Sequence, residues 1–324
     1  RLGSTVRFGD RRYGSPGIRM QTMAEPTFEF RVLVDPFAAY NFCELPVQPF
    51  VPIVPGPPVK WVAILPTMRR VGERFRLGLK AEDKWGNPSD RVDQVIRLEP
   101  SLPVQGLPEA VRFPPGQKSA AIDGLSVGMA GDLSILLKDE AGNLMAESNP
   151  LRIVERADLL PYWGDLHGQS EETIGTNSAE DYFLFARDIG FLDVMSHQGN
   201  DFQITDAFWD ELNRLTAAFD KPGEFVCVPG YEWSGNTGMG GDRNVFFRHE
   251  GRPIHRSSHV LTMGETGTPA CHTAHDLFAA IRNEDAVVIA HVGGRYADIA
   301  FAHDGRLERA VEVHASWGTC EWLL

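Results

Sequence analysis

The pattern of apolar residues changes near residue 157, and this change limits the possible folds more than any other feature of the chain. Before it, residues 75–81 alternate apolar and polar side chains with a period of two, as a half-buried strand requires. After it, apolar runs of strand length alternate with stretches of helical periodicity. We therefore expect an all-β domain over residues 61–156 and an α/β domain over residues 157–324. Residues 1–60 are rich in proline, arginine and aromatic residues, and we expect them to form an extended segment.

Two turns support a β-sandwich in the first of these domains. Residues 83–88 (Asp-Lys-Trp-Gly-Asn-Pro) and residues 139–143 each follow a predicted strand, and their glycine, asparagine and proline residues supply the bends that a sandwich needs. The first turn resembles the D-x-x-G-N-P turn of bacterial immunoglobulin-like modules. This resemblance implies an immunoglobulin-like β-sandwich for residues 61–156.

Composition and charge exclude several classes of protein. The formal net charge of the 324-residue chain is −13, so nucleic acid and anionic membrane surfaces would be repelled. No apolar run reaches the roughly 18 residues that a transmembrane helix needs. The four cysteines are far apart in the sequence and favour neither a disulfide framework nor a zinc knuckle. We expect a small anionic ester as the partner, with no nucleic acid and no membrane, and we leave a homo-oligomer open.

The two ends of the chain bear on its location. No secretory signal is visible, which favours the cytoplasm. The chain nevertheless begins at Arg1 and stops without a polar tail, so we interpret it as a fragment of a longer protein whose localisation is only weakly determined.

Polar residues follow the predicted strands of the second domain, at the point where each strand ends. All ten histidines of the chain lie between His167 and His314. Because near-continuous apolar strands separated by helices indicate a parallel sheet, and the carboxyl ends of parallel strands in an α/β barrel open on one rim, these residues would converge. The residues at the strand ends are His167, His197, Glu232, His291, Glu312 and His314.

Three or four imidazoles and a carboxylate are the ligand set that zinc, manganese or iron prefers. Such a site can make a nucleophile from water and polarise an ester oxygen. We therefore predict that His167, His197, Glu232 and His291 bind metal. The alternative for any single histidine is a hydrogen-bonded residue of the core or the rim.

The leader Tyr-Trp-Gly-Asp-Leu-His at residues 162–167, together with the order of the strand ends, resembles a large bacterial branch of the PHP (polymerase and histidinol phosphatase) superfamily. The resemblance covers about residues 158–324. It implies a distorted (β/α)7 barrel with a cluster of metal ions that mostly hydrolyses phosphoesters. The motif positions that it implies as metal ligands are His167, Gln169, His197, Glu232, Asp242 and His291.

The chain departs from the pattern of this superfamily at two motif positions. Gln169 stands where the H-x-H motif has its second histidine, and Ser196 stands where the D-H motif has aspartate. Asp242 offers a carboxylate that partly compensates. The final D-x-H motif would follow residue 314, and the chain ends before it. We therefore expect one or two ions of zinc, manganese or iron in a barrel that is truncated at its C-terminus.

Further residues near the strand ends have predicted roles in catalysis. Arg243 and Arg295 would hold an anionic group, although ordinary salt bridges are the alternative for both. Asp201 or His314 would act as general acid or base. Asp165, two residues before His167, would orient the imidazole of that histidine.

Three functions are compatible with these residues. The leading hypothesis is a metal-dependent hydrolase of a phosphoester that uses metal-activated water. The second is a degenerate PHP-like binding or scaffold module without catalysis, which the replacements at Gln169 and Ser196 motivate. The third keeps the metal but acts on another ester, such as a sulfate.

Overall fold

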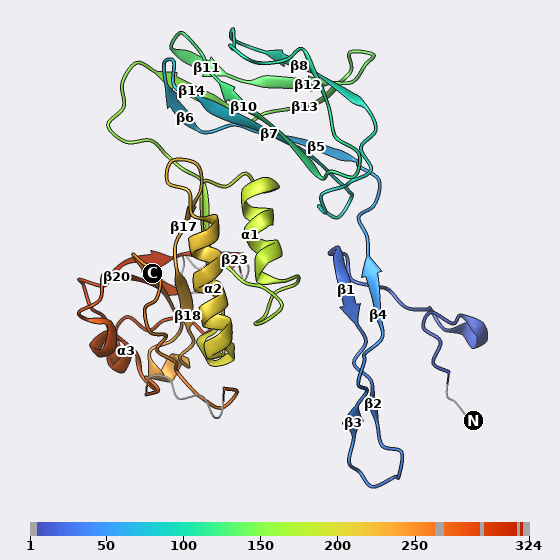
Figure 1. Ribbon diagram of the computed structural model, residues 1–324, viewed down its shortest axis with the longest axis vertical. Helices are drawn as coiled ribbons and strands as arrows, with labels where there is room; N and C mark the ends of the chain where they lie inside the picture. Colours follow the sequence, from blue (N-terminus) through green and yellow to red (C-terminus); the bar gives the residue numbers. More distant parts are fainter. Residues whose placement is uncertain (1–4, 263–268, 292–294, 316–317, 320–324) are drawn as a thin grey trace.

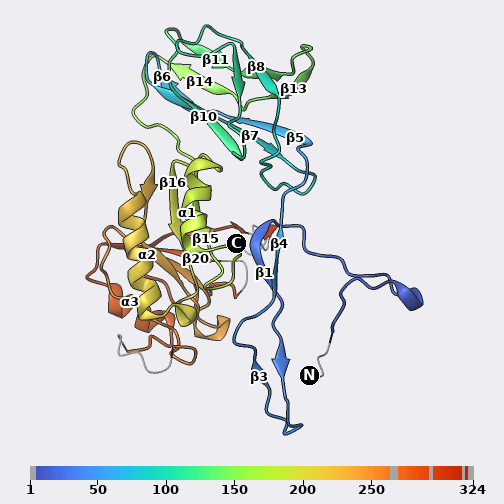
Figure 2. The same ribbon diagram turned by 45° about the vertical axis from the view of Figure 1, so that its right-hand side comes forward.

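The computed structural model describes residues 5–262, 269–291, 295–315 and 318–319 (Figure 1). The described chain begins with a short 3-10 helix (Arg12–Gly14) and a narrow ribbon. In the ribbon, β1 (Glu25–Glu29) pairs antiparallel with β4 (Phe50–Ile53), and β2 (Leu33–Val34) pairs antiparallel with β3 (Cys43–Glu44). Figures 1 and 2 show this ribbon standing beside the second half of the molecule and extending past it. Among residues 5–59 only Pro55 is buried, so the ribbon has no core of its own.

The strands between residues 60 and 154 surround one apolar core. They are β5 (Lys60–Ile64), β6 (Met68–Arg70), β7 (Phe75–Glu82), β8 (Val95–Pro100), β9 (Ala110–Arg112), β10 (Ser119–Leu125), β11 (Gly131–Leu133), β12 (Ile135–Lys138), β13 (Leu144–Glu147) and β14 (Leu151–Val154). Their sheets have the strand orders β10-β7-β5, β11-β14-β6 and β13-β12-β8-β9. Leu77, Leu79 and Ile96 are fully buried among them, because the apolar residues of alternating strands face inward.

The second half mixes helices with strands. Its main elements are β15 (Gly164–Gly168), α1 (Ala179–Asp188), β16 (Val194–His197), α2 (Asp206–Phe219), β17 (Val226–Cys227), β18 (Gly230–Trp233), β19 (Arg243–Phe247), α3 (Ala274–Ile281), β20 (Ala286–His291), β21 (Glu308–Glu312), β22 (His314–Ala315) and β23 (Gly318–Thr319), with 3-10 turns at Asp201–Gln203 and Thr237–Met239. One sheet has the order β15-β16-β17 and is parallel. A second has the order β18-β19-β20-β21, and β22 pairs with β23 alone. Asn200 forms an isolated parallel bridge to Glu232 and so joins the two larger sheets.

The expected (β/α)7 barrel is wrong. Among the described residues there are three α-helices, and β19 runs antiparallel to both β18 and β20. A barrel of that type needs parallel strands that are each followed by a helix. The nine residues between β18 and β19 are too few for a parallel crossover, which takes about a dozen residues or more. The chain therefore turns back as a hairpin, and the sheets of the molecule are mostly antiparallel.

Side-chain caps begin the helices. Ser178 accepts a hydrogen bond from the backbone N–H of Asp181, and Thr205 accepts one from the backbone N–H of Phe208. Thr273 and Asp276 form a capping box at α3. The apolar faces of these helices pack against the strands in a second core that includes Phe183, Trp209 and Leu277. No helix in the described part of the chain is both long and apolar enough to cross a bilayer.

The β-rich first half and the mixed second half meet through specific contacts. The indole Nε1 of Trp163 donates to Thr67 Oγ1 at 2.8 Å, and Ser119 Oγ donates to the carbonyl of Asp188 at 2.7 Å. The ring of Phe191 packs so closely on Gly78 that a Cβ atom at this glycine would overlap the ring. Glycine is therefore required at position 78 because another chain segment approaches its backbone.

Candidate metal centre

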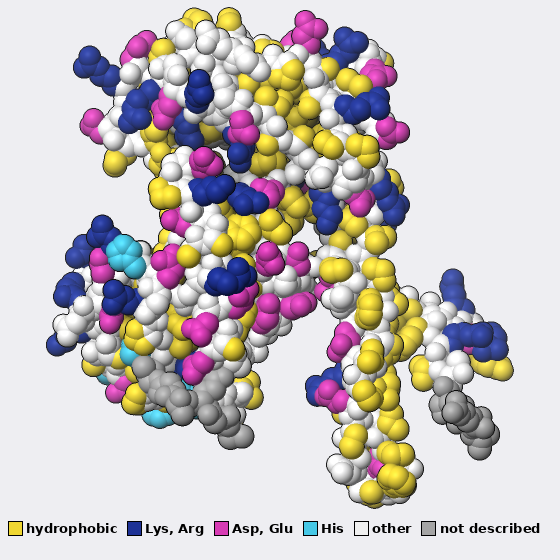
Figure 3. Space-filling model, viewed as in Figure 1, with side chains coloured by type: hydrophobic (Ala, Val, Ile, Leu, Met, Phe, Trp, Pro, Cys, Tyr) yellow, Lys and Arg dark blue, Asp and Glu magenta, His cyan; other side chains and the backbone are white. Residues whose placement is uncertain are grey.

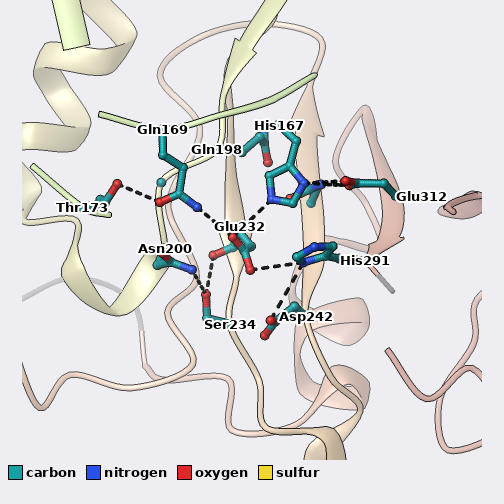
Figure 4. Close-up of polar contacts among 12 residues, drawn as sticks. His167, Gln169, Thr173, Gln198, Asn200, Glu232, Ser234, Asp242, His291 and Glu312 are labelled. Atoms are coloured by element: carbon teal, nitrogen blue, oxygen red, sulfur yellow. Dashed lines mark hydrogen bonds and ion pairs between the residues drawn. The ribbon is translucent and has the colours of Figure 1, made fainter. Parts of the chain in front are cut away.

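Three side chains from three strands meet in the second half of the molecule (Figure 4). His167 lies on β15, Glu232 on β18 and His291 at the end of β20. One potential ligand atom from each residue lies within 4.8 Å of the other two. His167 Nε2 is 3.4 Å from Glu232 Oε2, and His291 Nδ1 is 3.5 Å from Glu232 Oε1. We call these three residues the ligand cluster.

These separations suit a metal ion. Tetrahedral coordination with bonds of about 2.1 Å places the ligand atoms about 3.4 Å apart. His291 provides a second test of the fit, because its side chain is buried and neither of its ring nitrogens forms a hydrogen bond. Burying polar atoms without partners costs free energy, and a bound cation would supply the missing partner.

His167 is held in one orientation by Glu312 of β21. The carboxylate oxygens of Glu312 lie 2.8 and 2.7 Å from Nδ1 of His167, so this nitrogen carries the proton and Nε2 faces Glu232. The amide Nδ2 of Asn244 donates to Glu312 at 2.9 Å. A carboxylate that accepts a hydrogen bond from the far nitrogen of a histidine is typical of histidines that ligate metals.

Without a metal, the cluster is ionised at neutral pH. Burial lowers the pKa of His167, but its hydrogen bonds to Glu232 and Glu312 outweigh burial and raise the pKa to about 9. Burial raises the pKa of Glu232, whereas the neighbouring rings of His167 and His291 lower it to about 2. Glu232 is thus a carboxylate at neutral pH, in a buried position where its charge demands a positive partner.

Asp242 and Gln169, both predicted ligands, lie at the edge of the cluster. Asp242 Oδ2 is 3.9 Å from His291 Nδ1, and Asp242 accepts a hydrogen bond from Arg295 Nε at 3.0 Å. Burial and the charge of Glu232 raise the pKa of Asp242 to about 7, against the opposing effect of Arg295. Gln169 donates from Nε2 to Glu232 Oε2 at 3.0 Å. Its amide nitrogen therefore faces the cluster, while its Oε1 accepts from Thr173.

His197 does not join the cluster. Its Nε2 is 2.8 Å from Ser170 Oγ, and its Nδ1 accepts the backbone N–H of Gly199 at 3.2 Å. Since Nδ1 accepts, Nε2 carries the proton and donates to Ser170, so both ring nitrogens are occupied. Burial lowers the pKa of His197 to about 4. His197, predicted to bind metal, is instead a hydrogen-bonded residue of the core, the alternative that applies to any single histidine.

Two of the three predicted catalytic residues have structural roles. The guanidinium of Arg243 is fully buried, with Nε 2.8 Å from Glu308 and the other nitrogens on backbone carbonyls, so it does not reach the cluster. Asp201 accepts hydrogen bonds from the backbone N–H groups of Ser234 and Ser257, and burial raises its pKa to about 6. The third, His314, lies exposed on β22 and lines the same cleft as the cluster.

Sequence reasoning misassigned the residue that orients His167. The oxygens of Asp165 accept hydrogen bonds from the backbone N–H of His167 and the hydroxyl of Tyr182, both at 3.0 Å. The imidazole ring of His167 is hydrogen-bonded to Glu312 instead. The available signal was the position of Glu312 at the end of a predicted strand. Asn244, which fixes Glu312, gave no signal of its own in the sequence.

The ligand cluster opens into a cleft with a volume of about 2030 Å³. Residues of β15, α1, β18, β20 and β21 line it on one side. The ribbon lines it on the other side, through residues 23–26 and 52–55. Residues 86–88, Asp90 and Lys118 of the β-rich half also line it. The cleft is therefore shared between three parts of the chain.

Comparison with known proteins finds a family model that matches part of the chain, mostly within this half. Residues 154–303 match the family described as "Protein of unknown function (DUF3604)". This match, together with the antiparallel strands β18, β19 and β20, overturns the resemblance to the PHP superfamily.

Similar proteins are found over almost the whole chain. An uncharacterized protein of Chlamydia pneumoniae is 23% identical over 317 residues, which cover 93% of this chain and 48% of that protein. An uncharacterized protein of Chlamydia trachomatis is 22% identical over 336 residues, which cover 99% of this chain and 50% of that protein. The chain thus spans about half the length of the curated relatives it matches.

Solved structures give partial likenesses. The PKD domain of an M14-like peptidase from Thermoplasmatales archaeon SCGC AB-540-F20 is 13% identical with a TM-score of 0.21, over 31% of this chain and 99% of that domain. The Escherichia coli adhesin FdeC is 16% identical with a TM-score of 0.22, over 40% of this chain and 42% of that chain.

Proposed function

We propose that this chain is a metal-dependent hydrolase that holds a divalent transition-metal ion on His167, Glu232 and His291 and cleaves an ester, with a phosphoester as the first candidate. The observation that carries the proposal is the geometry of the cluster. Its ligand atoms are separated as the ligands of one ion would be, and both nitrogens of the buried His291 lack a hydrogen bond.

Each residue of the centre has a defined task in this proposal. His167 and His291 bind through one ring nitrogen each, and Glu232 binds through a carboxylate oxygen. Glu312 holds a proton on Nδ1 of His167, so Nε2 is the nitrogen that would bind the metal, and it would lose its own proton on binding. Arg295, whose backbone N–H and Nε both bind Asp242, is placed to neutralise an anionic product.

The ion supplies the chemistry that these side chains lack, because it polarises an ester oxygen and lowers the pKa of water. Asp242 lies next to the cluster, where its carboxylate is placed to accept or return a proton. The cluster offers two histidines and one carboxylate and leaves further coordination positions open. This ligand set is typical of a catalytic zinc site rather than a closed structural one.

The first test is the metal content of protein purified without added metal, measured by inductively coupled plasma mass spectrometry. We expect about one equivalent of zinc, manganese or iron, and its loss in the His291→Asn variant. The exposed His249 provides the control, because His249→Asn removes an imidazole away from the cluster and should retain the metal.

A panel of aryl phosphates, phosphodiesters and aryl sulfates then tests the reaction. We expect hydrolysis of one of the phosphoester classes that disappears in His291→Asn together with the metal. A folded protein that binds no metal even in a zinc titration would overturn the proposal and favour a binding module. Activity that survives metal loss would overturn the assignment of the cluster.

A further inference from the structure

The cleft extends well beyond the ligand cluster, and its two walls carry exposed apolar side chains. Leu166 of β15 with Leu184 and Phe185 of α1 lie on one wall, and Met23 and Val54 of the ribbon lie on the other. These five side chains are between 37% and 61% exposed. Figure 2 shows the ribbon strands β1 and β4 next to β15. Large apolar side chains that line both walls of one cleft are typical of a binding site rather than of scattered surface residues.

The fixed charges of the cleft are mostly negative. The carboxylates that line it are Glu25, Asp90, Asp165, Asp181, Glu232, Asp242 and Glu312, and its fixed cations are Lys118 and Arg295. One divalent ion would leave this set net negative. Figure 3 shows acidic side chains gathered on the body of the molecule where it faces the ribbon. A ligand with several negative charges would therefore be repelled along the cleft.

Two buried polar groups without a hydrogen-bond partner lie in the cleft near the ligand cluster. Asn200 and Asn244 both line the cleft, are almost fully buried, and have an Oδ1 atom without a hydrogen-bond partner. The orientation of Asn244 is fixed because only its Nδ2 can donate to the carboxylate of Glu312. These acceptors suit a polar group or water beside the cluster, so the polar end of a ligand belongs there.

We propose that the cleft binds an amphiphilic monoester, with its polar head at the ligand cluster and an uncharged alkyl chain or comparable apolar body between α1 and the ribbon. The position of the head rests on the proposed function. The position of the apolar body rests on the two walls alone. The ribbon is then a part of the binding site that selects for the apolar body.

The test compares phosphate, n-butyl phosphate and n-octyl phosphate by calorimetric titration of zinc-loaded protein and of protein treated with a chelator. Octyl phosphate should bind at least about tenfold more tightly than butyl phosphate, because four more methylene groups leave water. This ratio should be the same with and without zinc. Adenosine triphosphate, a polyanion, should bind more weakly than octyl phosphate.

The two proposals fail in different ways in this experiment. Binding of phosphate alone that does not depend on zinc counts against the metal centre, whereas the ratio of octyl to butyl affinity tests only the apolar walls. Equal affinities for the two alkyl phosphates would overturn the inference, and so would tighter binding of adenosine triphosphate.

Two matched variants test which wall of the cleft contacts the alkyl group of the ligand. Phe185→Ser should reduce the octyl phosphate affinity about fivefold and leave the phosphate affinity unchanged. Phe37→Ser removes an exposed phenylalanine from the ribbon outside the cleft and should leave both affinities unchanged. Both side chains are exposed, so neither change should unfold the protein. Equal losses in the two variants, or none in Phe185→Ser, would overturn the proposed wall.

Discussion

His167 and Glu312 are 145 residues apart in the sequence, yet Nδ1 of His167 lies 2.7 Å from a carboxylate oxygen of Glu312. This contact connects the first strand of the mixed half to β21. It also decides which nitrogen of His167 faces the ligand cluster. The contact therefore sets the affinity of the proposed centre without contributing a ligand to it.

Glu312→Gln should weaken zinc binding about tenfold or more, because a neutral amide orients and polarises the imidazole less well than a carboxylate. The measurement is a competition titration with a zinc-sensitive dye. Glu211→Gln on α2, where the partly exposed Glu211 pairs with Arg214, is the matched control and should bind zinc as the unchanged protein does. Equal affinities in the two variants would show that Glu312 does not support the centre.

Arg243→Leu should lower the free energy of unfolding by about 3–5 kcal/mol, because it removes the buried cationic partner of Glu308 and leaves only the half-exposed His303 beside that carboxylate. Urea denaturation measures this loss. Zinc affinity of the folded variant should stay within about twofold, since Arg243 binds Glu308 and backbone carbonyls rather than the cluster. A loss of metal without a loss of stability would instead support the catalytic role that the sequence suggested.

His197→Asn should destabilise the protein at pH 7 more than at pH 4.5. The folded pKa of about 4 lies below the ordinary value of 6.5, so the unfolded chain takes up a proton first as the pH falls. The unchanged protein therefore loses up to about 3 kcal/mol of stability between pH 6.5 and 4, and the variant does not. Other titrating groups, including Asp201, cancel in the comparison. A constant difference in urea denaturation at both pH values would contradict the assignment.

Gly78→Ala should cost about 1–3 kcal/mol, because the new methyl group overlaps the ring of Phe191 across the contact between the two halves. Gly128→Ala is the control in the same half of the molecule, since a Cβ atom there would meet nothing within 4 Å. It should change stability by less than about 0.5 kcal/mol. Thermal unfolding of both variants gives the comparison. Similar melting temperatures would mean that the contact is easily rearranged.

Local structure is the part of the fold that the sequence carries most directly. Ser178 and Thr205 precede acidic first turns and apolar helical faces, and both cap helices. The convergence of His167, Glu232 and His291 also followed from their positions at strand ends, although the sheet that brings them together is not a barrel. Strands β18 and β20 both run antiparallel to β19 and therefore parallel to each other, so Glu232 and His291 still lie toward the same edge of the sheet.

The strand directions could not be read from apolar runs, because a buried antiparallel strand is as continuously apolar as a parallel one. Residues of β19 are all buried, and the short glycine-rich connection before Arg243 was the better indicator of a hairpin. The prediction that His197 binds metal was wrong for a related reason. Its ring packs against Tyr182 of α1 and Phe208 of α2, so it points to the helix-covered face although it ends a strand.

The ligand cluster draws its residues from two sheets, with His167 in the first and Glu232 and His291 in the second. An ion bound there would act as a clamp between sheets that the backbone otherwise joins at the Asn200–Glu232 bridge. During synthesis such a clamp cannot close until β20 has left the ribosome, and its support by Glu312 comes later still. Metal capture would then mark the completion of this half of the molecule, and a chain stalled before residue 291 would emerge with a half-formed site.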